Sequence, residues 1–130
     1  MRILLDTDAY SALKRGHPAV AAVVRRAEDI VFSPVVAGEL LQGFRCGTHF
    51  ERNVGELEAF IANPFVRVSP VTMVTADRFG RIAAVLKRRG RPIPINDIWI
   101  AAQAMETGAE LVSFDRHFEA IDGLVWRRPA

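Results

Sequence analysis

Four acidic residues of this chain stand among apolar neighbours, where an unpaired carboxylate is costly. They are Asp6, Glu39, Asp97 and Asp115, and they are spread along the whole sequence. Carboxylates that folding brings together raise one another's pKa unless a cation neutralises them. Sites made of oxygen ligands suit Mg²⁺ and Mn²⁺. The sequence therefore predicts a shared site in which these four residues bind Mg²⁺ or Mn²⁺.

Such a site has a definite chemistry. A divalent ion held by carboxylates lowers the pKa of a bound water, orients it for attack and offsets charge on a phosphate oxygen. Each acid taken alone also has an ordinary explanation, because Glu39 can border an apolar helix face and Asp97 can favour a helix dipole. The positions of the four acids would then need four separate explanations, whereas a single metal site accounts for all of them.

Short apolar segments alternate with amphipathic helical stretches along the chain. The expected strands are 2–5, 30–32, 65–68, 110–113 and 124–126, and the expected helices are 9–14, 17–28, 34–46, 48–62, 72–89 and 96–107. Strands separated by pairs of helices predict an α/β fold with a parallel sheet and helices on both faces. In such sheets a site lies beyond the carboxyl ends of the strands. Asp6 and Asp115 both follow expected strands, as this rule requires.

Residues next to the four acids have structural interpretations as well. Asp8 suits the N-cap of the helix expected from Ala9, and a role as an additional metal ligand is the alternative. Asn96 is expected to cap the helix that carries Asp97. Asp115 could in the same way cap a short turn through Phe118.

Composition limits the class of protein. The 130 residues, half of them hydrophobic, predict a single domain, 1–130, with one core. No apolar run approaches the roughly 20 residues of a membrane span, and the N-terminal run is too short for a signal peptide. The single cysteine, Cys46, fits a reducing cytosol, so we expect a cytoplasmic protein without a membrane partner. All basic residues except Lys14 and Lys87 are arginines, which bind phosphate well.

At these residues the chain resembles the PIN-domain ribonucleases, and most closely the VapC-type toxins of bacterial toxin–antitoxin pairs. The matching segments are 4–8, 33–40, 93–102 and 111–118, in the family's order. The resemblance implies a three-layer α/β/α sandwich with a central parallel sheet. It implies Mg²⁺- or Mn²⁺-dependent cleavage of RNA, often tRNA, with Asp6, Glu39, Asp97 and Asp115 as the metal-binding and catalytic residues.

Supporting residues and partners follow from the same resemblance. Thr7 and Ser113 match hydroxyl positions that orient the site, and Asp8 stands where the family often has Asn or Ser. The family implies a homodimer and a cognate antitoxin that inhibits the enzyme in a hetero-oligomeric complex. Such complexes bind DNA only through the antitoxin.

Basic residues near the acids are expected to bind RNA. The densest basic cluster, 87–91, ends the longest expected helix and precedes the Asp97 segment. It is interpreted as a phosphate-binding track, although positive charge also suits a helix C-terminus. The expected RNA-binding residues are Arg88, Arg89, Arg91 and Arg116. His117, which follows Arg116, is assigned no role.

Two other functions remain open. Asp6-Thr7-Asp8 resembles the Asp-x-Asp of haloacid dehalogenase-type phosphatases, in which the first Asp is a nucleophile and the second an acid. That pattern requires Thr or Val where Tyr10 stands, and a later lysine for which Lys87 is the only candidate. A non-catalytic RNA-binding or assembly module is the other alternative, and it predicts an incomplete set of carboxylates.

Overall fold

A central parallel sheet organises the protein, which a computed structural model describes over residues 1–130. The strand order is β3-β2-β1-β4-β5, and every neighbouring pair is parallel. The strands are β1 (Arg2–Leu5), β2 (Asp29–Phe32), β3 (Val66–Val68), β4 (Glu110–Val112) and β5 (Trp126–Arg127). The predicted α/β fold with a parallel sheet is confirmed.

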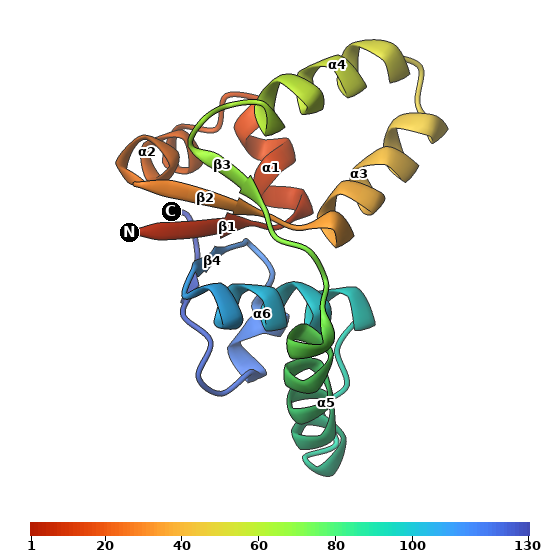
Figure 1. Cartoon of the computed structure of the whole chain (residues 1–130), viewed down its shortest axis with the longest axis vertical. Coiled ribbons are helices and arrows are strands. Elements are labelled where there is room, and N and C mark those ends of the chain that lie inside the picture. Colours follow the sequence, from red (N-terminus) through yellow and green to blue (C-terminus); the bar gives the residue numbers. More distant parts are fainter.

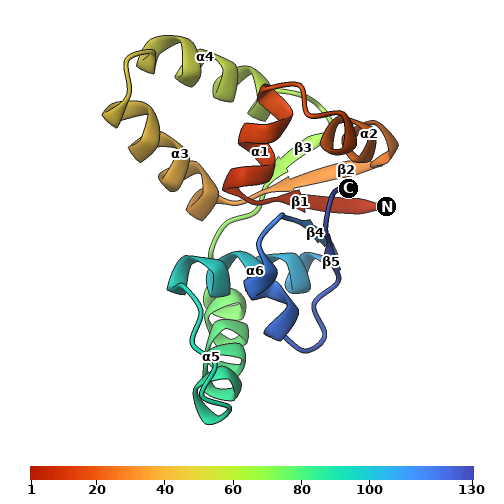
Figure 2. The ribbon, with the colours of Figure 1, turned by 180° about the vertical axis from the view of Figure 1, so that it is seen from behind.

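Helices cover both faces of this sheet (Figures 1 and 2). They are α1 (Thr7–Lys14), α2 (Pro18–Arg26), α3 (Pro34–Cys46), α4 (Phe50–Ile61), α5 (Met73–Arg88), α6 (Ile95–Thr107) and the short 3₁₀-helix η1 (Arg116–Ala120). Parallel crossovers are right-handed. The crossovers from β1 to β2 and from β2 to β3 therefore place α1–α4 on one face. The chain then returns across the sheet to β4, which places α5 and α6 on the other.

The first strand lies in the middle of the sheet. Leu4 of β1 pairs with Val31 on one side and with Leu111 on the other, and all three side chains are fully buried. Strands covered on both faces are continuous apolar runs, as these are. They belong to one hydrophobic cluster of 26 buried residues. The strand order reverses between β1 and β4, and parallel sheets have their ligand sites at such a reversal.

The N-cap residues of two helices differ from the sequence-based expectation. Asp6, and not Asp8, is the N-cap of α1, because the Asp6 carboxylate accepts a hydrogen bond from the backbone N–H of Ala9. The helix therefore begins at Thr7, and Asp8 is an exposed residue of its first turn. Pro94, and not Asn96, is the N-cap of α6. Its carbonyl accepts from the N–H of Asp97, and Asn96 lies inside the helix.

Other boundaries differ by a few residues at most. α3 covers 34–46 as expected, with Ser33 as its N-cap and Pro34 at its first position. β5 begins two residues later than predicted. None of the helices combines the length and the apolar character that a membrane crossing requires.

Candidate active site

Asp6 is the most deeply buried acid of the protein. It follows β1 and is 6% exposed. Its Oδ1 accepts from the N–H of Ala9 at 2.9 Å, and its Oδ2 accepts from the hydroxyl of Ser113 at 2.5 Å. Burial raises the pKa of Asp6 from 3.8 to about 6, although both hydrogen bonds act in the opposite direction. Asp6 is thus a buried carboxylate whose hydrogen-bond donors are neutral.

Asp97 and Asp115 approach Asp6 from two other elements. Asp97 lies in the first turn of α6, and Asp115 follows β4 as the N-cap of η1. The pKa of Asp97 is raised to about 6, first by burial and then by the negative charges of Asp115, Asp6 and Glu39. Asp97 therefore lies within electrostatic reach of the other three acids. The structure brings all four predicted acids to one edge of the sheet.

Glu39 joins the site from α3, on the opposite face of the sheet from α6. Its Oε1 accepts from the hydroxyl of Thr7 at 2.5 Å, and its Oε2 accepts from the amide of Asn96 at 3.3 Å. Thr7 and Ser113, the two expected hydroxyl positions, thus each donate to one site carboxylate. The Ser113 hydroxyl also accepts from the backbone N–H of Asp115 at 2.9 Å. These hydroxyls hold Asp6, Glu39 and the backbone of Asp115 in place.

His117 also belongs to the site, although the sequence analysis assigned it no role. Its Nδ1 lies 3.0 Å from Asp115 Oδ1 and 3.7 Å from Asp97 Oδ2. Asp97, Asp115 and His117 each offer one possible ligand atom, and these atoms lie within 4.8 Å of one another. The sequence feature that could have predicted this placement is the two-residue spacing of Asp115 and His117 at the start of a short helix. This spacing places the His117 ring beside the carboxylate that caps the helix.

The four carboxylates have no lysine or arginine of the chain as an ion-pair partner. None of the ion pairs of the protein joins one of them to a lysine, an arginine or the N-terminus. Asp8 adds a further negative charge, which also raises the pKa of Asp6. Oxygen ligands without a neutralising side chain are the donor set that Mg²⁺ or Mn²⁺ requires. The residues present therefore fit a divalent ion.

The expected RNA-binding arginines lie at two separate places. Arg116 is an exposed residue of η1, beside Asp115. Arg88, Arg89 and Arg91 lie at the far end of α5, which points away from the sheet (Figure 1). Arg89 forms an ion pair with Asp122 at 2.6 Å. Of the four arginines, only Arg116 is next to a site carboxylate in the sequence and in the fold.

A groove leads to the carboxylates between α3 and α6. Its volume is about 380 Å³, and Glu39 and Asn96 form part of its wall. The other lining residues are Pro34, Val35, Gly38, Gln42, Val71 and Trp99. The Trp99 ring stacks on Phe79 with 4.1 Å between the ring centroids, which fixes that wall. The groove thus offers polar and apolar surface directly beside the site.

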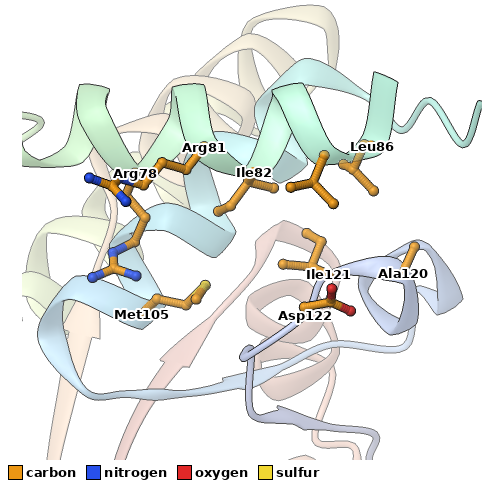
Figure 3. A pocket seen from close by; sticks show the side chains of 9 residues that line it. Arg78, Arg81, Ile82, Leu86, Met105, Ala120, Ile121 and Asp122 are labelled. Carbon is orange, nitrogen blue, oxygen red and sulfur yellow. The ribbon is translucent and has the colours of Figure 1, made fainter. Parts of the chain in front are cut away.

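A second cavity is independent of the carboxylates. It measures about 150 Å³ and lies between α5 and the segment 120–122 (Figure 3). Ile82, Leu86 and Ile121 form its apolar wall, and Arg78 and Arg81 lie at one end. No site acid lines it, so the candidate active site remains the one at the β1/β4 edge.

Comparison with known proteins agrees with this geometry. The sequence pattern of the PIN domain family matches residues 3–124. The chain belongs to the PIN domain family. The PIN domain is 33% identical to the tRNA(fMet)-specific endonuclease VapC of Shigella flexneri and 30% identical to ribonuclease VapC2 of Haemophilus influenzae, with 95% of each chain covered in both cases.

A solved structure resembles the PIN domain over nearly its full length. It is the DNA-bound VapBC of Salmonella typhimurium, with a TM-score of 0.86, 26% identity and 98% of both chains covered. The three-layer α/β/α arrangement is the one expected. The phosphatase alternative is not favoured, because Asp8 is exposed on α1 and Lys87 lies at the distal end of α5.

Proposed function

We propose that this PIN domain is a metal-dependent endoribonuclease and the toxin of a toxin–antitoxin pair. The observation that carries the proposal is the group of four carboxylates, two of them with raised pKa, that no lysine or arginine neutralises. RNA as substrate is supported by relatives that are named as ribonucleases and as a tRNA endonuclease.

The proposed metal ligands are Asp6, Glu39, Asp97 and Asp115, and the proposed ion is Mg²⁺ or Mn²⁺. A bound divalent ion supplies an activated water and stabilises negative charge on the phosphate that is attacked. Thr7 and Ser113 orient the carboxylates, because each hydroxyl donates to one of them. Asp8 contributes negative charge from the first turn of α1.

RNA reaches this site past positive side chains. Arg116 is the nearest in sequence to a site acid and contacts the phosphate beside the cleaved bond. Arg88, Arg89 and Arg91 contact RNA further away, at the end of α5, where phosphate binding is sensitive to salt. Arg89 does so while its charge is shared with Asp122.

Protein partners complete the proposal. The resemblance to a DNA-bound VapBC complex supports an antitoxin partner and contact with DNA through that antitoxin. We further propose that residues 1–130 form one domain, that the toxin is a homodimer within a larger toxin–antitoxin complex, and that it acts in the cytoplasm.

RNA cleavage by the purified, antitoxin-free chain tests the proposal. We expect tRNA to be cleaved with Mg²⁺ or Mn²⁺, and Asp6→Asn to reduce the rate by at least about 100-fold, because this substitution removes a metal ligand. Asp77→Asn is the matched control, since Asp77 is exposed on α5 and pairs only with Arg81. Circular dichroism confirms that both variants fold. If neither metal supports cleavage of any RNA, the nuclease assignment is wrong.

A further inference from the structure

The ring of His117 faces the site carboxylates and has no other partner. The side chain is 53% exposed, and its Nδ1 lies 3.0 Å from Asp115 Oδ1 and 3.7 Å from Asp97 Oδ2. Ligands at a right angle on one ion lie about 3 Å apart when their bonds are about 2.1 Å long. The His117 nitrogen is therefore spaced from the two oxygens much as neighbouring ligands of a single ion are.

The backbone keeps the ring in this place. The N–H of His117 donates to Asp115 Oδ1 at 2.9 Å, so that the residue is attached to the carboxylate its ring faces. Asp115 is itself held by the hydrogen bond from its N–H to Ser113. The ring thus needs no rearrangement of η1 to remain beside Asp97 and Asp115.

The other two histidines have different surroundings. His17 caps α2 through its Nδ1, and its ring packs against Phe114 at 5.3 Å between centroids. His49 precedes α4, makes no side-chain capping bond and is exposed. His117 is therefore the one histidine of the chain that offers a ring nitrogen to the carboxylate site.

We infer that His117 is a nitrogen ligand of the metal centre and that it gives this centre a preference for transition-metal ions over Mg²⁺. The inference rests on the proposed function, because it adds a ligand to the same site. Carboxylate oxygens suit Mg²⁺ and Mn²⁺, whereas imidazole nitrogen suits ions later in the first transition row. A site with four carboxylates and one imidazole binds Co²⁺ more tightly than Mn²⁺, and Mn²⁺ more tightly than Mg²⁺.

The competing explanation is that His117 only orients Asp115 by hydrogen bonding. His117→Asn separates the two roles, because its amide can still donate a hydrogen bond to Asp115 but is a poor ligand for these ions. His117→Ala removes both roles. His49→Ala is the matched control, since it deletes an exposed histidine that precedes α4 and makes no side-chain capping bond.

Calorimetric titration of the full chain with Co²⁺, Mn²⁺ and Mg²⁺ gives the decisive measurement. We expect both His117 variants to lose about 10- to 100-fold in Co²⁺ affinity, a smaller factor for Mn²⁺ and less than about threefold for Mg²⁺. The visible absorption of bound Co²⁺ should change in both variants. His49→Ala should match the unsubstituted chain in every titration.

Two results would overturn the inference. The first is a His117→Asn variant that binds Co²⁺ as tightly as the unsubstituted chain does, and the second is an equal loss for Co²⁺ and Mg²⁺. RNA cleavage in Mg²⁺ is measured in parallel and is independent of this outcome. If the chain cleaves RNA but the His117 variants lose no preference for Co²⁺, only the proposed role of His117 is refuted and the nuclease assignment stands. A metal preference without cleavage supports that role and refutes the nuclease assignment.

Discussion

At the scale of single residues, Asp6 combines two tasks that oppose each other. Its carboxylate caps α1 and accepts from Ser113, which favours the ionised form. Its burial disfavours that form and raises the pKa to about 6. At neutral pH the metal-free protein must therefore hold a charge that its surroundings oppose, and a bound cation relieves this cost.

This conflict predicts the behaviour of Asp6→Asn without metal. The folded-state pKa is above the unfolded value of 3.8, so the folded protein binds more protons between about pH 4 and pH 6. Protonated Asp6 therefore stabilises the folded state fully below about pH 4, and this stabilisation is lost as the pH rises through about 6. Asn is uncharged, so the variant does not lose stability as the pH rises. We therefore expect the metal-free variant to be about 1–3 kcal/mol more stable toward unfolding than the unsubstituted protein at pH 7.5.

Urea denaturation between pH 4 and pH 8 measures this difference. The gain should shrink toward zero at pH 4, where Asp6 is protonated in the folded state. Equal stabilities of the two proteins at pH 7.5 would show that the carboxylate is not destabilised by its burial.

At the scale of elements, most of the fold was predictable and the site contacts were not. Continuous apolar strands and the Ser33-Pro34 start of α3 are local signals, and they placed those elements correctly. The cap of α1 was misassigned because two acids compete for it. Asp6 is selected by a hydrogen bond from Ser113, a residue 107 positions away that no local pattern reveals.

Long-range contacts also explain why the roles of Asn96, His117 and the basic cluster 87–91 could not be predicted from the sequence. Asn96 is of a residue type that often caps helices, but its side-chain amide instead donates a hydrogen bond to Glu39 on another helix. The role of His117 depends on η1 turning its ring toward Asp97. The 87–91 cluster is near Asp97 in sequence, yet α5 carries it away from the sheet (Figure 1).

Helix α3 offers a steric test of the groove beside the site. Gly38 lines this groove, whereas Gly43 on the same helix does not, and a Cβ added at either position meets no atom within 4 Å. We expect Gly38→Leu to slow RNA cleavage by at least about tenfold, because its side chain occupies space beside Glu39. Gly43→Leu is the matched control and should cleave normally.

Thermal melts and the initial cleavage rates of both variants check this expectation. Both substitutions replace glycine inside a helix and should leave stability unchanged or slightly increased. A Gly38→Leu enzyme as fast as Gly43→Leu would exclude the groove from the path of the RNA.

At the scale of the whole molecule, the site connects the two helical layers. Glu39 comes from α3 on one face, Asp97 comes from α6 on the other, and Asp6 and Asp115 follow the central strands β1 and β4 (Figure 2). An ion bound by all four would link α3 on one face of the sheet to α6 on the other and to the ends of β1 and β4. Binding to the folded state alone stabilises it by mass action.

We therefore expect Mn²⁺ at about 100 times its dissociation constant to add about 2.7 kcal/mol to the unfolding free energy. Differential scanning calorimetry with and without Mn²⁺ measures the accompanying rise in Tm. Asp97→Asn should lose most of this rise, whereas Asp77→Asn, at an exposed position of α5, should keep it. A rise of equal size in both variants would place the ion elsewhere.

The central position of the first strand also determines when the acidic site is complete. A ribosome releases β1 and Asp6 early, but β4 must insert on the other side of β1 before Asp115 and His117 join them. The four carboxylates are therefore assembled only after the strand that precedes Asp115 has paired with β1.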